Sequence, residues 1–353
     1  MSIDVIMPKM GMGMSEGKLA RWQVKDGDSV EAGEVVLEVE TDKATAEMTA
    51  DVDGVISVVV AEGEVVNVGT VLARIEPAEG AVVKPQVQGS AEDPSVEILQ
   101  VNGIALNVQQ TGEGPAVVFI HGLSSSMELW AGLEQASLKG HTLISYDLRG
   151  HGRSEQTPGA HTFRKHTADL AGLLETLGVE QASLVGHSLG AMIAVELAAT
   201  RPERVRSLSL LSTTAAFPQE TRNILFELAS AATFGGMEGI ADPLIKLTFR
   251  DAFRDVNPKV VEAIRRSILS SDASSIVAAT RMVAKADLRP RLGSLECPTQ
   301  VLVGLQDSLT PPDLSRQLSE AIKEAQLHVL PDCGHAAPVE QPALVTQLLA
   351  DFV

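Results

Sequence analysis

Glycine and valine residues recur at a constant offset of 36 positions within the first 77 residues of the chain. Short valine-rich stretches separated by glycines are typical of β-strands joined by tight turns. Two copies of such a unit predict a small, pseudo-symmetric all-β sandwich. The matched pairs are Gly27 and Gly63, Val30 and Val66, Gly33 and Gly69, Val35 and Val71, and Val39 and Ile75.

The junction between the two copies, residues 40–45, is expected to be a hairpin exposed at one end of the sandwich. Lys43 stands at its tip. A lone exposed lysine is in most proteins only a solubilising surface charge. Here the two symmetric halves present the turn that carries it, so Lys43 is a candidate functional residue.

The front of the chain is also its most acidic part. Residues 1–77 carry 6 of the 28 basic and 15 of the 46 acidic side chains, which is half of the net charge of −18. We therefore expect a separate acidic module there. Residues 78–94 are rich in proline, alanine and glycine and have no helical or strand periodicity, which predicts a flexible linker.

The pattern changes at residue 95, where apolar strand-like runs begin to alternate with segments of helical periodicity. This alternation predicts a doubly wound, mostly parallel sheet over residues 95–353. Between about 214 and 288 the strand-like runs stop and the pattern is helical. That interval is expected to be a helical cap over the carboxyl edge of the sheet.

The segment Gly186-His187-Ser188-Leu189-Gly190 follows an apolar stretch and opens a helical one. G-x-S-x-G alone is a weak signal, but between a buried strand and a helix it is the pattern of a nucleophile elbow. The glycines are expected because the turn is too tight for a Cβ atom at their positions. Ser188 is therefore the candidate nucleophile.

Asp307 and His335 each follow a predicted strand later in the chain. The order Ser188, Asp307, His335 is that of an α/β-hydrolase triad. In such a triad Ser188 attacks an acyl carbonyl, His335 takes the serine proton, and Asp307 orients the imidazole. The backbone N–H groups of Leu123 and Leu189 are expected to stabilise the oxyanion.

Composition argues against several other functions. The net charge of −18, without a basic stripe, makes binding to nucleic acid or to an anionic membrane surface unexpected. The eight histidines show no metal-ligand spacing, so no metal site is expected. No apolar run reaches the length of a membrane span, and the first residues lack a signal-peptide pattern. With only two cysteines, Cys297 and Cys333, the chain is expected to be cytoplasmic with free thiols.

Residues 1–77 resemble the lipoyl domains of 2-oxo acid dehydrogenase complexes. The resemblance implies that lipoic acid is joined by an amide bond to Lys43. Biotin domains share the fold but carry methionines on both sides of the lysine, where this chain has Asp42 and Ala44, so lipoate is favoured over biotin. The resemblance rests on Met7-Pro8, Gly27, Asp42-Lys43-Ala44 and Gly54.

Residues 96–353 resemble the α/β-hydrolases, to which residues 146–154 add a further likeness. The fusion of the two modules resembles the dihydrolipoamide acetyltransferase components of acetoin dehydrogenase complexes. It implies that a thiamine-diphosphate-dependent dehydrogenase loads an acetyl group on the arm of Lys43, and that the group passes through Ser188 to coenzyme A in acetoin catabolism. The implied partners are that dehydrogenase and dihydrolipoamide dehydrogenase, in a multienzyme complex of a homo-oligomeric chain.

Two other functions stay open at this point. A serine acyl-enzyme of this fold usually reacts with water, so the chain could be an esterase or thioesterase recruited by its lipoyl domain. It could also be a non-catalytic lipoyl carrier or scaffold. No basic cluster in the sequence marks a site for the phosphates of coenzyme A.

Overall fold

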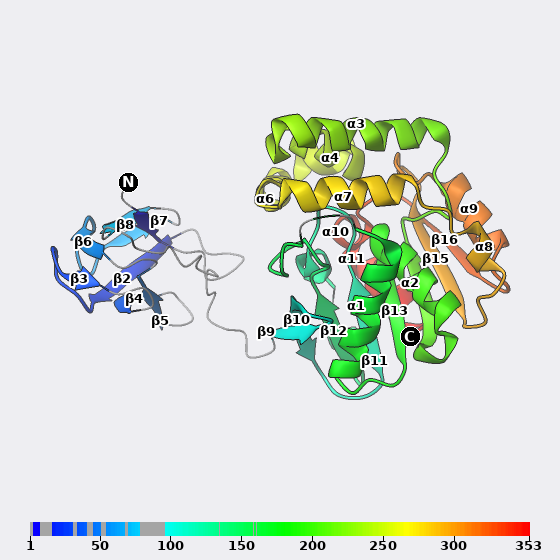
Figure 1. Ribbon diagram of the computed structural model, residues 1–353, viewed down its shortest axis with the longest axis horizontal. Coiled ribbons are helices and arrows are strands. Elements are labelled where there is room, and N and C mark those ends of the chain that lie inside the picture. The colour runs from blue at the N-terminus through cyan, green and yellow to red at the C-terminus, as the bar shows by residue number, and fades with distance from the viewer. Residues whose placement is uncertain are drawn as a thin grey trace. The chain divides into compact units, whose positions relative to one another are not determined.

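The computed structural model divides the chain into two compact units, residues 1–94 and 95–353 (Figure 1). Lys43 and the predicted linker, residues 78–94, lie outside the residues that the structure describes. The described residues are 3–7, 16–30, 34–40, 45–50, 54–67, 70–77, 96–133, 135–157, 159 and 161–353.

The front unit is a sandwich of two four-stranded sheets with equivalent strand orders, β1-β8-β6-β3 and β5-β4-β2-β7. The equivalence confirms the predicted pseudo-symmetric sandwich. Its core contains buried residues from both copies of the repeat, such as Val36 and Leu72. The strands are β1 (Ile3–Ile6), β2 (Glu16–Trp22), β3 (Ser29–Val30), β4 (Val35–Glu40), β5 (Thr45–Thr49), β6 (Gly54–Val58), β7 (Val65–Asn67) and β8 (Val71–Pro77).

Two glycine turns explain the 36-residue repeat. Gly27 and Gly63 have φ angles of 87° and 89°, a region that glycine enters without steric cost. The N–H of Gly27 donates to the carbonyl of Ile56, and the N–H of Gly63 donates to the carbonyl of Leu19, both at 2.8 Å. Because each turn closes on a strand of the other copy, the two halves fold as one sandwich.

The second unit is built on an eight-stranded sheet of order β16-β15-β14-β13-β11-β12-β10-β9. β9 and β10 form a hairpin, β10 is antiparallel to β12, and the remaining neighbours are parallel, as predicted. The strands are β9 (Val96–Val101), β10 (Ile104–Thr111), β11 (Ala116–Ile120), β12 (Thr142–Tyr146), β13 (Ala182–His187), β14 (Val205–Leu211), β15 (Thr299–Gly304) and β16 (Gln326–Leu330).

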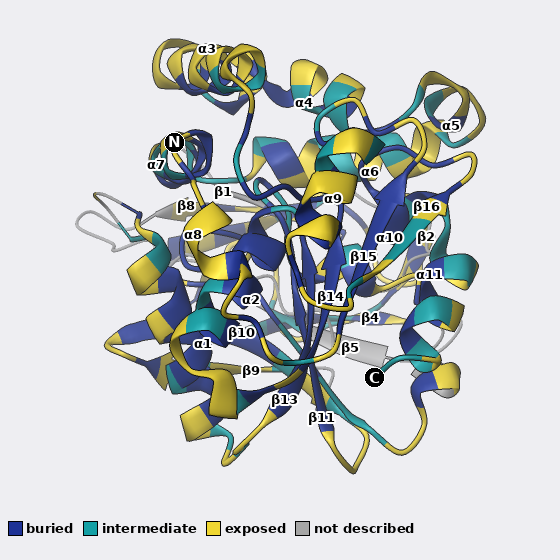
Figure 2. Cartoon of the chain, turned by 90° about the vertical axis from the view of Figure 1, so that its right-hand side faces the viewer, coloured by how far each residue is buried: buried dark blue, intermediate teal, exposed yellow. Residues whose placement is uncertain are grey.

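Apolar clusters cover both faces of this sheet. Val118 and Leu184 pack in one cluster, with α1 (Phe163–Thr176), α2 (Leu189–Thr200) and α9 (Pro312–Glu320). Their neighbours Val117 and Val185 pack in the other, with α11 (Pro342–Ala350). Successive strand residues point to opposite faces, so strands that are apolar throughout require a layer on each side. Figure 2 shows these strands buried between the outer helices.

The helical interval lies between β14 and β15, and we call its helices α3 to α7 the cap. Figure 1 shows α3, α4, α6 and α7 together at one end of the sheet. The helices are α3 (Gln219–Gly235), α4 (Ala241–Thr248), α5 (Asp251–Val256), α6 (Pro258–Leu269) and α7 (Ala273–Ala284), followed by α8 (Arg289–Leu292). In the described part of the chain, no helix is long and apolar enough to cross a membrane.

Candidate active site

Ser188 occupies the sharp turn between β13 and α2. Its φ and ψ angles are 52° and −113°, which are unusual for a residue with a side chain and store strain at this position. The backbone N–H of Ser188 donates to the carbonyl of Leu211 on the neighbouring strand at 2.8 Å. This strained strand-to-helix turn has the geometry of a nucleophile elbow.

The two glycines of the motif are required by close backbone packing. A Cβ atom on Gly186 would lie 2.5 Å from Cα of Ala191, and one on Gly190 would lie 2.1 Å from the carbonyl oxygen of Ile120. Neither position can accept a side chain unless the backbone moves. The prediction that this turn is too tight for a Cβ atom is confirmed.

Asp307 and His335 lie together in the loops after β15 and β16. Oδ2 of Asp307 and Nδ1 of His335 are 2.9 Å apart, and both side chains are almost fully buried. Oδ1 of Asp307 accepts from the backbone N–H groups of Leu309 and Thr310, and Oδ2 accepts from the Thr310 hydroxyl. Burial alone would raise the pKa of Asp307, but His335 and Thr310 outweigh it and hold that pKa below its usual value. Asp307 is therefore a carboxylate that fixes the ring of His335.

His187 connects the nucleophile turn to the loop of His335. Its Nε2–H donates to the backbone carbonyl oxygen of His335 at 2.9 Å, and the two ring centroids are 5.0 Å apart. Burial lowers the pKa of His187 to about 3, so the ring is neutral. Since Nε2 carries the proton, the buried Nδ1 is a free lone pair, and it has no partner among the described residues.

The cap is hydrogen-bonded to the same loop. The carbonyl of Thr248, at the end of α4, accepts from the N–H groups of His335 and Ala336 at 3.0 and 3.2 Å. Nε of Arg250 donates to Oε2 of Glu340 at 2.9 Å, while Oε1 of Glu340 accepts from the N–H of Gly334 at 3.2 Å. The side chain of Glu340 is fully buried. These hydrogen bonds link the loop of His335 to the cap.

The two candidate oxyanion residues come from two separate segments of the chain. Leu189 is the first residue of α2, and half-buried Leu123 follows β11. A Cβ atom on Gly122 would lie only 3.2 Å from Cβ of Ser188, so the Leu123 loop runs close to the serine. His121 holds this loop, because its Nδ1 donates to the carbonyl of Gly122 and its Nε2 accepts from the N–H of Leu148. The assignment of Leu123 and Leu189 to an oxyanion hole stays a prediction.

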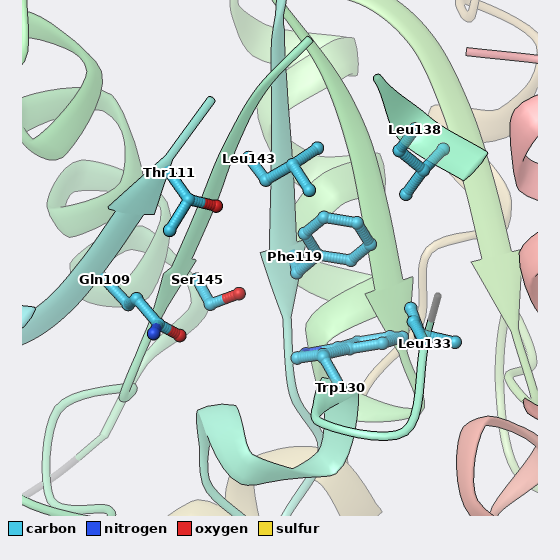
Figure 3. Close-up of a pocket in the computed structure, with 8 residues that line it drawn as sticks. All are labelled: Gln109, Thr111, Phe119, Trp130, Leu133, Leu138, Leu143 and Ser145. Atoms are coloured by element: carbon cyan, nitrogen blue, oxygen red, sulfur yellow. The ribbon is translucent and has the colours of Figure 1, made fainter. Parts of the chain in front are cut away.

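Neither a small cavity beside Trp130 nor the two cysteines offers a second candidate catalytic site. A cavity of about 30 Å³ between β11, β12 and Trp130 has room for water only (Figure 3). Cys297 and Cys333 are free, and burial raises the pKa of both thiols, that of Cys333 to about 12. Across the described ranges, no group of three or more His, Cys, Asp or Glu side chains could hold a metal ion.

Sequence reasoning missed the supporting residues of this site. His187 stands inside the G-x-S-x-G motif, and Thr310 stands three residues after Asp307. Closeness to a candidate catalytic residue was the only sequence feature that could have indicated a role for either residue. Arg250 and Glu340 are 90 residues apart and carry no local signal.

Two family models match the chain. One, described as alpha/beta hydrolase fold, matches residues 115–342, and one for biotin- and lipoyl-type domains, described as biotin-requiring enzyme, matches residues 3–75. The second match agrees with the lipoyl resemblance of the front unit.

Similar proteins include two that match over nearly the whole chain. A "Dihydrolipoyllysine-residue acetyltransferase component of acetoin cleaving system" from Pseudomonas putida is 28% identical and covers 98% of this chain and 97% of its own. The protein of the same name from Cupriavidus necator is 26% identical over 96% of this chain and 94% of its own. The solved enol-lactonase from Burkholderia xenovorans LB400 is 29% identical and covers 72% of this chain and 99% of its own, with a TM-score of 0.70.

Proposed function

The chain belongs to the α/β-hydrolase fold family and carries a lipoyl-type domain in front of it, and from this premise we propose that it is an acyltransferase. It moves an acetyl group from a lipoyl arm on Lys43 to coenzyme A through an acyl-enzyme on Ser188. The observation that carries this proposal is that similarity to acetyltransferase components of the acetoin cleaving system spans 98% of the chain, including both units. Acetoin catabolism is therefore the proposed setting.

The front unit fits a lipoyl attachment site. β4 and β5 pair in antiparallel fashion with Glu40 opposite Thr45, so the residues between them connect two paired strands. Lys43 belongs to this connection, outside the described residues. A lipoyl group on Lys43 would supply the acetyl group as a thioester.

The first half-reaction follows from the residues around Ser188. Nε2 of His335 accepts the hydroxyl proton while Oγ of Ser188 attacks the thioester carbonyl, and Asp307 stabilises the imidazolium that forms. The N–H groups of Leu123 and Leu189 stabilise the tetrahedral oxyanion, each by about 3–4 kcal/mol. When the C–S bond breaks, His335 returns the proton to the departing sulfur, which leaves as a thiol.

The second half-reaction runs the same steps with a new nucleophile. His335 takes the proton of the coenzyme A thiol, whose sulfur attacks the acetyl-serine ester. Collapse of the tetrahedral intermediate breaks the ester bond, and His335 reprotonates Ser188. The products are acetyl-CoA and the free enzyme.

Hydrolysis is the second candidate function, and it is favoured by the likeness to an enol-lactonase. The two functions differ only in whether water or a thiol reaches the acyl-enzyme, which the cap would control.

The test offers S-acetyl-dihydrolipoamide to the purified full chain, with and without coenzyme A, and measures acetyl-CoA and acetate. We expect mainly acetyl-CoA, lost in Ser188→Ala. Mainly acetate, formed at the same rate without coenzyme A, would establish a thioesterase. Acyl turnover by the reconstituted complex that is unchanged in Ser188→Ala would instead favour the carrier or scaffold role.

The same proposal includes the partners and the location. A thiamine-diphosphate-dependent dehydrogenase would load the arm, dihydrolipoamide dehydrogenase would reoxidise it, and the chain would act as a homo-oligomer in their complex. A linker at residues 78–94 would hold the arm at about millimolar effective concentration near Ser188. The two free cysteines support a cytoplasmic location.

A further inference from the structure

A groove of about 990 Å³ lies between α7 and the helices packed around it. In Figure 1, α3 and α7 form a layer over α1 and α2. We call this space the α7 groove. Its lining includes Phe163 of α1, Glu196 of α2, Thr233 of α3, Arg281 of α7, and Lys285 and Arg291.

Two cations of the α7 groove have no ionic partner in the part of the chain that the structure describes. Both carboxylates of its lining are paired with arginine: Glu196 with Arg291 at 3.2 Å, and Asp287 with Arg289 at 2.6 Å. Arg281 and Lys285 are four positions apart, so they share one side of the chain at the end of α7, and both are exposed. Neither forms a salt bridge or side-chain hydrogen bond within the described ranges. Although the chain has a net charge of −18, this lining has three cations, Arg281, Lys285 and Arg291, against two carboxylates.

Part of the lining of the α7 groove is apolar. Val277, Ala278 and Met282 of α7 line it, together with Ala286 and Leu288. A groove whose lining combines apolar side chains with exposed cations suits a ligand that has an anionic head and a long, weakly polar arm.

Two features place the α7 groove near the nucleophile turn. Glu196 lies on α2 eight residues after Ser188, which corresponds to about 12 Å along the helix axis. On the other side, the N–H of Leu288 donates to the carbonyl of Ala215 at 2.7 Å, and the hydroxyl of nearby Thr213 donates to the carbonyl of Ser188 at 3.1 Å. The groove therefore lies within reach of a ligand arm whose far end must meet Ser188.

We propose that coenzyme A binds in the α7 groove, with its phosphates at Arg281 and Lys285 and its pantetheine arm along the apolar part of the lining toward Ser188. This inference rests on the proposed acetyl transfer and adds the site that the sequence did not mark. Arg281 and Lys285 bind the acceptor and take no part in the acyl chemistry.

The experiment compares Arg281→Ala/Lys285→Ala with the unchanged full chain, using S-acetyl-dihydrolipoamide as donor. Coenzyme A and pantetheine, which lacks the phosphates, serve as alternative acceptors. The matched control is Lys259→Ala/Arg266→Ala, which removes two exposed cations from cap helix α6 outside the groove. We expect KM for coenzyme A to rise about tenfold or more, because two charge-assisted contacts to phosphate are lost. KM for pantetheine and kcat stay unchanged, and the control behaves like the parent chain.

A second donor, the acetylated lipoyl domain of the chain itself, is measured in parallel. Three results would overturn the inference: an unchanged KM for coenzyme A, an equal rise for coenzyme A and pantetheine, or a loss of activity confined to the lipoyl-domain donor. The last would indicate that the cations dock the acidic front unit instead. If the parent chain forms no acetyl-CoA, the proposed function fails. Calorimetric titration of Ser188→Ala with coenzyme A, with and without the two substitutions, still decides whether the groove binds it.

Discussion

The ring of His187 donates a hydrogen bond of 2.9 Å from Nε2 to the backbone carbonyl oxygen of His335. The residue before the candidate nucleophile thus holds the backbone of the candidate base. His187 belongs to the nucleophile motif and also contacts the loop of the candidate base. It therefore links Ser188 to His335.

Replacing His187 with phenylalanine should lower kcat about tenfold, because the His335 carbonyl would lose its buried donor. His187→Gln, which can still donate, should retain more of the activity. The measurement is acetyl-CoA formation from S-acetyl-dihydrolipoamide, with circular dichroism to verify folding. If the folded Phe variant matches the parent chain, His187 does not position His335.

Replacing Asp307 with asparagine should reduce kcat by a factor of about 10³ to 10⁴, because the amide cannot stabilise the His335 imidazolium. Asp313→Asn, the same change at an exposed position on α9, is the matched control and should leave kcat unchanged. A loss smaller than tenfold in Asp307→Asn would remove Asp307 from the proposed mechanism.

Removing Arg250 should destabilise the second unit and slow catalysis together. Arg250→Met leaves the fully buried Glu340 carboxylate unpaired, which should cost about 3 kcal/mol in the free energy of unfolding. Arg250→Met/Glu340→Met removes both charges and should recover most of that stability. Activity should stay low in the double variant even so, because Glu340 no longer holds the N–H of Gly334 beside His335. Full activity in the double variant would show that the contacts of Arg250 and Glu340 do not position His335.

The second unit should lose stability in mild acid. Burial keeps five histidines neutral in the fold, while the unfolded chain binds protons as the pH falls below the ordinary value of 6.5. Their stabilising effect is complete above pH 6.5 and is lost toward pH 4, at about 1.4 kcal/mol per histidine per pH unit. The pKa is lowered to about 4 for His121, His151 and His161, to about 3 for His187, and well below its usual value for His166.

Urea unfolding can measure this effect. In a Trp22→Phe background, Trp130 reports on the second unit alone, because the chain has two tryptophans. The free energy of unfolding should fall between about pH 7 and about pH 5.5, and more gently in His166→Asn. A free energy that is constant over this interval would contradict the assignment of neutral buried histidines.

Local patterns predicted much of the fold and the order of the site. The 36-residue repeat indicated the sandwich because Gly27 and Gly63 adopt positive φ, and the motif around Ser188 indicated the elbow because Gly186 has no room for a side chain beside Ala191. Such constraints act within a few residues, so they are visible in the sequence.

Contacts made by the cap could not be predicted in the same way. Arg250 meets Glu340, and the cations Arg281 and Lys285 border the same groove as Arg291, only after the cap helices pack on the sheet. No spacing along the chain encodes these pairings. For the same reason, the sequence suggested acyl transfer but gave no site for the acceptor.

The central claim is that Ser188 carries the acetyl group between the lipoyl thioester and coenzyme A. The most direct measurement is rapid-quench peptide mass spectrometry of Lys43→Ala, which has no arm of its own, mixed with S-acetyl-dihydrolipoamide without coenzyme A. We predict one acetyl group on the peptide that contains Ser188, and its quantitative recovery as acetyl-CoA when coenzyme A is added. An unmodified Ser188 during turnover, or an acetyl group that leaves only as acetate, would contradict the account.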